Sequence, residues 1–139
     1  MKIYTIGYGG RSQDDFLKLV RDAGVRTIVD IRLRPDRASM GIWMKAKTPD
    51  RGIERWLGQA GLSYRSLVEL GNVFVDQNDW HEQYQQLLDG AGEVLVRRLL
   101  EVPGPVCLLC AEKRVSDCHR RQVANYLAAS HQAVIQHLE

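Results

Sequence analysis

The chain has 139 residues, of which 45% are hydrophobic and 26% charged, so composition predicts one globular domain over residues 1–139 and excludes a disordered chain. Its formal net charge of only +2 does not by itself indicate nucleic-acid binding. No apolar run reaches the roughly 20 residues that cross a membrane, and the amino-terminal residues lack the pattern of a secretory signal, so we expect a cytoplasmic protein. The three cysteines, Cys107, Cys110 and Cys118, agree with a reducing compartment, and their odd number argues against a disulfide framework.

The first part of the chain predicts a strand–helix–strand unit. Residues 2–6 alternate in polarity as a short strand does. Ser12, with Asp15 three residues later, resembles the start of a helix, and apolar residues follow at helical spacing as far as Gly24. Residues 26–31 form the next predicted strand, so this unit has the length of a parallel crossover.

The rest of the chain continues to alternate between helices and strands. The run VCLLC is apolar at every position, which suits a strand at the centre of a sheet. One predicted helix runs from Thr48-Pro49 to about Gln59. Another begins at Asp79 and is interrupted by Gly90 and Gly92, and a further helix runs to about Glu101. The last predicted helix runs from about Asp117 to Ser130. The predicted strands are residues 62–67, 106–110 and 133–138.

This alternation predicts an α/β fold, a single domain with a mainly parallel sheet of about five strands and helices on both faces. We expect the strand order 3-2-1-4-5, which places the fourth strand beside the first. The loops after these two strands, residues 7–12 and 110–117, then diverge at the carboxyl edge of the sheet, where ligands bind in such folds.

Three cations, His119, Arg120 and Arg121, begin the last predicted helix, although the amino end of a helix disfavours positive charge. The inward stripe of this helix extends back to Arg120 and His119, whereas Arg121 faces outward. Two interpretations of Arg120 remain open. It binds an anion in the crevice together with the helix amides, or it pairs with a carboxylate of the chain such as Asp117 or Glu112.

Cys110 ends its strand at the predicted crevice, where basic neighbours would lower the pKa of the thiol and make it a nucleophile. The alternative is a small buried apolar side chain. Glu112 is a candidate general base, and Cys118 is intermediate between a reactive and a buried thiol. We expect no metal site at Cys110, Cys118 and His119, because no Cys-x2-Cys pair exists and adjacent helical residues point about 100° apart.

Two other strand ends supply candidate residues for the crevice. In the loop after the first strand, Gly7 and Tyr8 would line the site and Arg11 would contact an anion, although a tight strand-to-helix turn explains the glycines equally well. Asp30 and Arg32 close the second strand, either as a structural salt bridge or as a wall of the crevice.

The loop of residues 32–47 is long for a compact domain, which indicates a lid or a binding loop. It combines cations such as Arg37 with Trp43, and this mixture suits single-stranded nucleic acid, because bases stack on aromatic rings while phosphates meet cations. Alternatively, Trp43 packs into the core beneath solvated charges.

Four segments, TIGYGGRS, VDIRLRP, GLSYRSLVELG and LLCAEKRVSDCHRRQVANYL, together resemble the domain-of-unknown-function 488 family of bacteria and archaea over nearly the whole chain. The family carries a TIG start, a VDVR strand followed by a proline, and a CAEK…CHR block. The resemblance implies an α/β fold and no established activity. Its motif positions correspond to Thr5, Gly7, Arg11, Asp30, Arg32, Pro35, Arg37, Cys110, Glu112, Lys113, Cys118, His119 and Arg120.

The chain departs from the family pattern in two places. Tyr8 stands where a histidine is common, and the family's LGGR run is LGN here, which removes one arginine. A mechanism that needs either of these residues is therefore in doubt for this chain.

We expect a protein that binds a phosphorylated or otherwise anionic small molecule in the crevice, without a cofactor. The sequence names no reaction, so it leaves open whether the protein is an enzyme. The alternatives are a nucleic-acid-binding module that uses loop 32–47 and a thiol redox protein. The expected anion contacts are Arg11, Arg32, Arg37, Lys113, Cys118, His119 and Arg120, with Cys110 or Glu112 as nucleophile or base.

Overall fold

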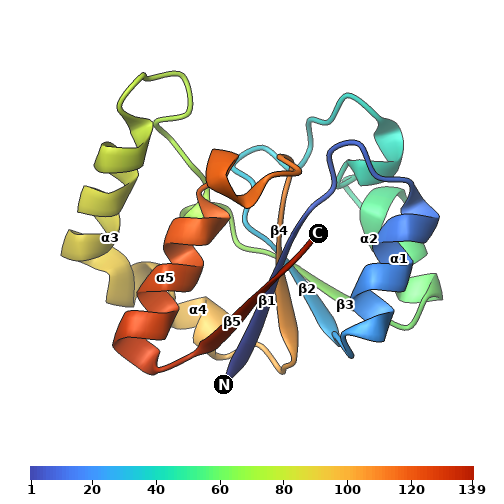
Figure 1. The fold of residues 1–139 in the computed structure, drawn as a ribbon. Helices are drawn as coiled ribbons and strands as arrows, with labels where there is room; N and C mark the ends of the chain where they lie inside the picture. The colour runs from blue at the N-terminus through green and yellow to red at the C-terminus, as the bar shows by residue number, and fades with distance from the viewer.

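Five parallel strands form one sheet in the computed structural model, which describes residues 1–139 (Figure 1). Each strand begins and ends within one residue of its predicted range, and every neighbouring pair is parallel. The predicted α/β class is therefore confirmed. The strands are β1 (Lys2–Gly7), β2 (Thr27–Asp30), β3 (Ser63–Ser66), β4 (Val106–Cys110) and β5 (Val134–Leu138).

Helices cover both faces of the sheet, with α1 and α2 on one face and α3, α4 and α5 on the other (Figure 1). α1 begins as predicted, because the Ser12 hydroxyl accepts a hydrogen bond from the amide of Asp15 at 3.1 Å. The α-helices are α1 (Gln13–Asp22), α2 (Gly52–Gln59), α3 (Trp80–Leu95), α4 (Arg97–Leu100) and α5 (Arg120–His131). Three short 3₁₀ helices are η1 (Gly41–Trp43), η2 (Val68–Leu70) and η3 (Val115–Asp117).

The strand order is β3-β2-β4-β1-β5, so the predicted order 3-2-1-4-5 is wrong in one respect. β4 lies between β2 and β1, and not on the far side of β1. β4 is therefore the middle strand of the five, and its burial at all five positions suits the centre of the sheet. By contrast, β3 and the first four residues of β5 alternate between exposed and half-buried positions, as edge strands do.

Two helices differ from their predicted extents. α3 runs unbroken through Gly90 and Gly92, because a glycine costs a helix only about 1 kcal/mol. A Cβ atom at Gly92 would overlap the ring of Tyr126 in α5, so this glycine allows the two helices to approach closely. α5 begins at Arg120, three residues after the predicted start near Asp117, because η3 and one extended residue come first.

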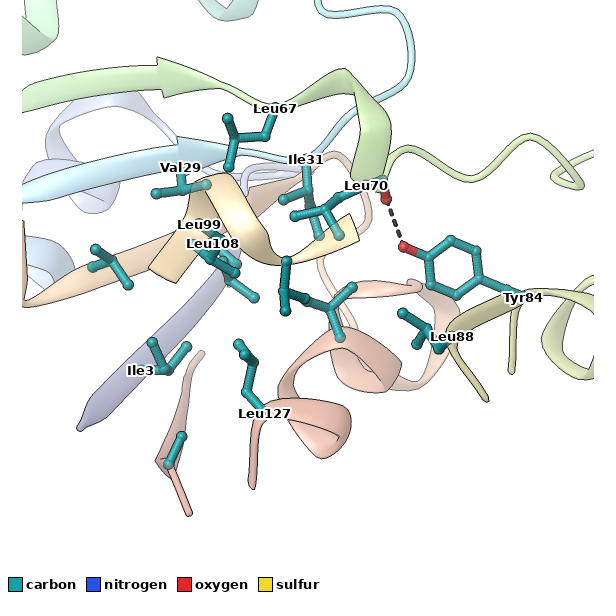
Figure 2. Packing of buried hydrophobic residues seen from close by; sticks show 14 residues of the cluster. Ile3, Val29, Ile31, Leu67, Leu70, Tyr84, Leu88, Leu99, Leu108 and Leu127 are labelled. Atoms are coloured by element: carbon teal, nitrogen blue, oxygen red, sulfur yellow. Dashed lines mark hydrogen bonds between the residues drawn. The ribbon is translucent and has the colours of Figure 1, made fainter. Parts of the chain in front are cut away.

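The hydrophobic core has two halves, one on each face of the sheet. The half beneath α3, α4 and α5 contains residues of β1, β2 and β4 that point toward Leu127 of α5 and Leu88 of α3 (Figure 2). The hydroxyl of Tyr84, in α3, donates a hydrogen bond to the carbonyl of Leu70 at 2.6 Å, so this half leaves no unpaired hydroxyl.

The half of the core beneath α1 and α2 is built from the alternate residues of the same strands. Leu108 faces α5 and its neighbour Leu109 faces α1, as the period of two in a strand requires. Since Leu108 and Cys110 are two residues apart, Cys110 ends β4 on the side of α5.

Candidate functional site

A pocket of about 390 Å³ lies at the carboxyl edge of the sheet. The chain leaves β1 and β2 toward α1 and α2, whereas it leaves β4 toward α5 on the opposite face (Figure 1). These diverging loops open the pocket, as in other folds with such a switch in strand connection. Its lining residues are Tyr8, Arg32, Leu33, Arg34, Arg37, Asn72, Val75, Trp80, Cys110, Ala111, Glu112, Asp117, Cys118 and His119.

Cys110 and Cys118 form a disulfide in the wall of this pocket. The expectation that an odd number of cysteines argues against disulfides therefore fails for this pair, while Cys107 remains free and buried in mid-strand. The Cys110 sulfur also contacts a carboxylate oxygen of Glu112 at 3.3 Å. The structure thus brings the candidate nucleophile, the candidate base and Cys118 together.

His119 lies beside this disulfide and is almost fully buried. Its Nε2 lies 3.0 Å from the carbonyl oxygen of Ile31, and its Nδ1 lies 3.8 Å from the Cys118 sulfur. Burial lowers the pKa of His119 to about 4, against the raising effect of the Ile31 and Leu70 carbonyls. The imidazole is therefore neutral at pH 7.

The sequence predicted that Cys118 and His119 lie in the first turn of the last helix, but both precede α5 in the structure. Cys118 has extended backbone dihedrals after η3, and His119 is the N-cap of α5. The two residues are therefore not held about 100° apart by a helix, which was one of the reasons for expecting no metal site.

Neither of the two interpretations of Arg120 matches the contacts of its side chain. Its side chain is fully buried, as the inward stripe predicted, while Arg121 is exposed. It neither lines the pocket nor meets a carboxylate. Instead it donates to the carbonyl oxygens of Glu112 at 2.6 Å and Lys113 at 3.1 Å.

A third acceptor, the hydroxyl of Thr5, lies 3.3 Å from Nε of Arg120. Burial lowers the pKa of Arg120, although a guanidinium stays charged in proteins. A Cβ atom at Gly7 would collide with the Glu112 carbonyl, so Gly7 is needed for the close approach of this loop to β1. Arg120 and Gly7 together fix the loop that carries Glu112.

Asp30 and Arg32 form a buried ion pair at the end of β2. Nε and Nη2 of Arg32 donate to the two Asp30 oxygens at 2.9 and 2.6 Å, and the hydroxyl of Tyr64 donates to the same carboxylate. Burial opposes the charge of Arg32, but Asp30 outweighs it and raises the pKa of the guanidinium. The pair is thus both a structural salt bridge and, through Arg32 and Tyr8, a wall of the pocket.

The remaining predicted anion contacts divide into two groups. Arg11 donates to the carbonyls of Gly7 at 2.8 Å and Leu138 at 3.4 Å, and it lies outside the pocket wall, as does Lys113. Arg37 lines the pocket and is exposed, and its guanidinium makes no hydrogen bond or ion pair. Of the predicted arginines that line the pocket, Arg37 is therefore the one whose side chain has no partner within the chain.

Trp43 of the long loop is buried against other aromatic rings. It stacks on Tyr8 with centroids 4.7 Å apart and meets Trp56 edge to face at 5.3 Å. Its exposed fraction is 1%, so the ring is not accessible to a base. This arrangement matches the interpretation in which Trp43 packs into the core.

The sequence missed one side of the pocket, which Asn72, Val75 and Trp80 contribute. These residues follow β3, whose carboxyl end lies at the same edge of the sheet. The prediction of a parallel β3 already implied that the segment after it lies at this edge. That segment has no regular period, so its pocket-lining residues could not be singled out. Leu33, Arg34, Ala111 and Asp117 were also missed as lining residues.

The fold and the pocket together define an α/β protein with one parallel sheet and a cysteine-containing cleft at its carboxyl edge. The family model described as "Domain of unknown function DUF488" matches residues 12–127. The chain therefore belongs to this family, and the resemblance found in the sequence is confirmed. No curated protein and no solved structure matches the chain. None of its helices combines the length and the apolar character needed to span a membrane.

Proposed function

We propose that the protein exchanges electrons with a small anionic thiol compound through the Cys110–Cys118 disulfide. The observation that carries this proposal is the position of the disulfide in the wall of a pocket of about 390 Å³. Both cysteines are nearly buried, with exposed fractions of 3% and 4%. A reagent therefore reaches the sulfur atoms by entering the pocket, which favours a small molecule over a protein partner.

The exchange involves two thiols of the partner and one disulfide of the protein. The thiolate of the first small molecule attacks one cysteine sulfur, the S–S bond breaks, and its electron pair leaves on the other cysteine. A second small thiolate then attacks the partner's sulfur in the mixed disulfide and releases the first cysteine. Two small thiols become one small disulfide, and the protein gains two electrons and two protons as its dithiol.

Arg37 supports an anionic partner. Its guanidinium faces the pocket without an internal carboxylate, whereas Arg32 is neutralised by Asp30 and Arg34 pairs with Asp36 at 3.3 Å. An unpaired cation in the pocket wall attracts negatively charged reagents, and it acts against the carboxylates of Glu112 and Asp117, which line the same wall. We therefore take Arg37 as the anion contact, since it is the pocket-lining arginine whose guanidinium has no carboxylate partner.

The proposal is tested with three thiols of similar size and different charge: mercaptoethanesulfonate, mercaptoethanol and cysteamine. The oxidised protein is mixed with each, quenched with iodoacetamide, and its newly released thiols are counted by mass. Each rate is divided by the thiolate fraction of the reagent, because the thiolate is the attacking species. We expect the anionic thiol to react faster than the cationic one by on the order of tenfold at low salt.

The matched variants are Arg37→Gln, which removes the free guanidinium, and Arg121→Gln, which removes an exposed arginine outside the pocket. Arg37→Gln should abolish the preference for the anionic thiol, and Arg121→Gln should retain it. Equal rates for all three thiols would contradict an anionic partner. Failure of every small thiol to reduce the folded protein would contradict the exchange function itself.

A further inference from the structure

We propose that the protein in its reduced state binds a zinc ion through Cys110, Cys118 and His119. Their ligand atoms, two sulfurs and one imidazole nitrogen, all lie within 4.8 Å of one another. Two thiolates and one imidazole form a ligand set that zinc accepts in sites with an open fourth position. This inference rests on the proposed function in one respect, namely that the disulfide can be reduced.

The spacing of the ligands fits tetrahedral coordination after a small movement. With Zn–S and Zn–N bonds of about 2.3 and 2.05 Å, a tetrahedral site places sulfur and nitrogen about 3.6 Å apart. The Cys118 sulfur and Nδ1 of His119 are 3.8 Å apart. When the disulfide opens, the two sulfurs separate toward the roughly 3.8 Å that two thiolates on one zinc ion require.

The hydrogen bond of His119 selects the nitrogen that faces the cluster. Because the carbonyl of Ile31 can only accept, Nε2 at 3.0 Å must carry the proton. Nδ1 then bears the lone pair, and it is the nitrogen on the side of the Cys118 sulfur. A second partner that fixes the ring and its tautomer in this way is typical of histidines that bind metals.

The charge and the surroundings of the cluster also suit zinc. All three side chains are almost fully buried, and two thiolates with one Zn²⁺ form a neutral group, which avoids an uncompensated buried charge. The amide of Arg120 donates to the Cys118 sulfur at 3.4 Å, which supports a thiolate there. Since the three ligands line the pocket, the fourth coordination position opens to a water molecule or a pocket ligand.

The test begins with a thiol count on the full chain. The protein is reduced with a phosphine, the reductant is removed under anaerobic conditions, and thiols are counted after unfolding. One thiol, that of Cys107, is expected before reduction, and all three cysteines of the chain after it. A count that stays at one contradicts the exchange function, so that failure is recognised before any metal is added.

The reduced protein is then titrated with Co²⁺, and the zinc affinity is measured by competition with a chromogenic chelator. We expect a thiolate-to-cobalt charge-transfer band that saturates at one equivalent and disappears when Zn²⁺ is added. This band requires sulfur ligands, so it does not arise from exposed histidines. The oxidised protein should give no band, because disulfide sulfurs are not thiolates.

Three variants assign the ligands. Cys118→Ser and His119→Gln should each weaken zinc binding by roughly 100-fold or more. The glutamine amide can still donate to the Ile31 carbonyl, so His119→Gln removes the ligand nitrogen while preserving the bond that holds the side chain. Cys107→Ala removes the buried cysteine outside the cluster and should leave the affinity unchanged.

Two results would overturn the zinc site. One is the absence of the cobalt band in protein whose three thiols have been counted. The other is an equal affinity for zinc in Cys118→Ser, His119→Gln and Cys107→Ala, which would place the ion elsewhere. Circular dichroism of each variant separates a lost ligand from a lost fold.

Discussion

Two buried arginines, Arg32 and Arg120, lie near the ends of neighbouring strands, yet their charges are compensated in different ways. Arg32 faces a carboxylate and forms a two-pronged pair with Asp30. Arg120 is fully buried and donates to three uncharged oxygens, two of them backbone carbonyls. One charge is balanced by another side chain, whereas the other is solvated by the dipoles of a loop.

Residue type alone suggests the same two roles for Arg32 and Arg120, ligand binding or structural support, and the difference in their partners tells the roles apart. The Arg32–Asp30 pair builds a wall of the pocket and leaves little free charge for a ligand. Arg120 positions the segment between Cys110 and Cys118, and hence Glu112, from behind the pocket. The arginine that begins α5 therefore serves here to hold a loop and not to bind a ligand.

The largest effect is expected from Arg32→Met, because this substitution leaves the Asp30 carboxylate buried without its counter-charge. Asp30 has no exposed surface, and breaking a buried ion pair from one side costs about 3–5 kcal/mol. Urea unfolding of the variant, followed by circular dichroism, measures the loss in free energy of unfolding.

The double variant Asp30→Asn/Arg32→Met sharpens this result. It removes both charges and should recover most of the lost stability, since a buried pair often contributes little more than uncharged residues in its place. Arg34→Met is the matched control, because Arg34 is exposed and should cause no measurable change. If the double variant were as unstable as Arg32→Met, packing and not charge pairing would explain the effect.

Arg120→Met should cost less, about 2–3 kcal/mol, because each carbonyl that loses its donor is itself uncharged. The same substitution also relieves the buried charge of Arg120. Urea unfolding gives the stability, and amide hydrogen exchange should show faster exchange in residues 111–117, where the loop loses its anchor.

The comparison predicts that no second substitution fully rescues Arg120→Met, since two of its three partners are backbone carbonyls. Arg121→Met is the matched control, because the next residue is exposed and should leave both stability and loop exchange unchanged. Equal behaviour of Arg120→Met and Arg121→Met would break the comparison, and the loop would then be held by the disulfide alone.

The fold was largely predictable because the periods of strands and helices are visible in the residues. All five strands and the inward direction of Arg120 follow from these periods. The strand order does not follow from these periods, although the evenly apolar run of β4 already favoured a central position. The start of α5 was also misplaced, because residues 115–117 form a 3₁₀ turn whose side chains carry no distinguishing pattern.

The site was less predictable, and the reason is physical. Two of the three partners of Arg120 are backbone carbonyls, which every residue possesses, so these two contacts leave no trace in the sequence. The pairing of Cys110 with Cys118 depends on where the chain returns after residues 111–117, and composition does not determine that path. Asp30 and Arg32, in contrast, are two residues apart on one strand, and their pairing was one of the two expected readings.

The smallest effect is expected from Tyr64→Phe, which removes one of the donors to Asp30 and keeps the ion pair. A hydrogen bond to a charged group contributes about 1.5–3 kcal/mol, but here two Arg32 nitrogens still serve the same carboxylate, so we expect a loss near the lower end. Urea unfolding at pH 7 measures it, and Tyr84→Phe, which removes the bond to the Leu70 carbonyl, is the matched tyrosine control away from the ion pair.

The pH dependence of this variant tests whether Tyr64 holds its proton more tightly in the folded chain than in the unfolded chain. Burial and the negative charge of Asp30 raise the pKa of Tyr64 above its ordinary 10.0, so the folded chain keeps a proton that the unfolded chain releases. That contribution to stability is complete below pH 10 and is lost as the pH rises further. The stability of the wild type should therefore fall more steeply than that of Tyr64→Phe above pH 10, and the two curves should converge. Parallel curves would mean that neither burial nor the Asp30 charge raises the pKa of Tyr64 in the folded chain.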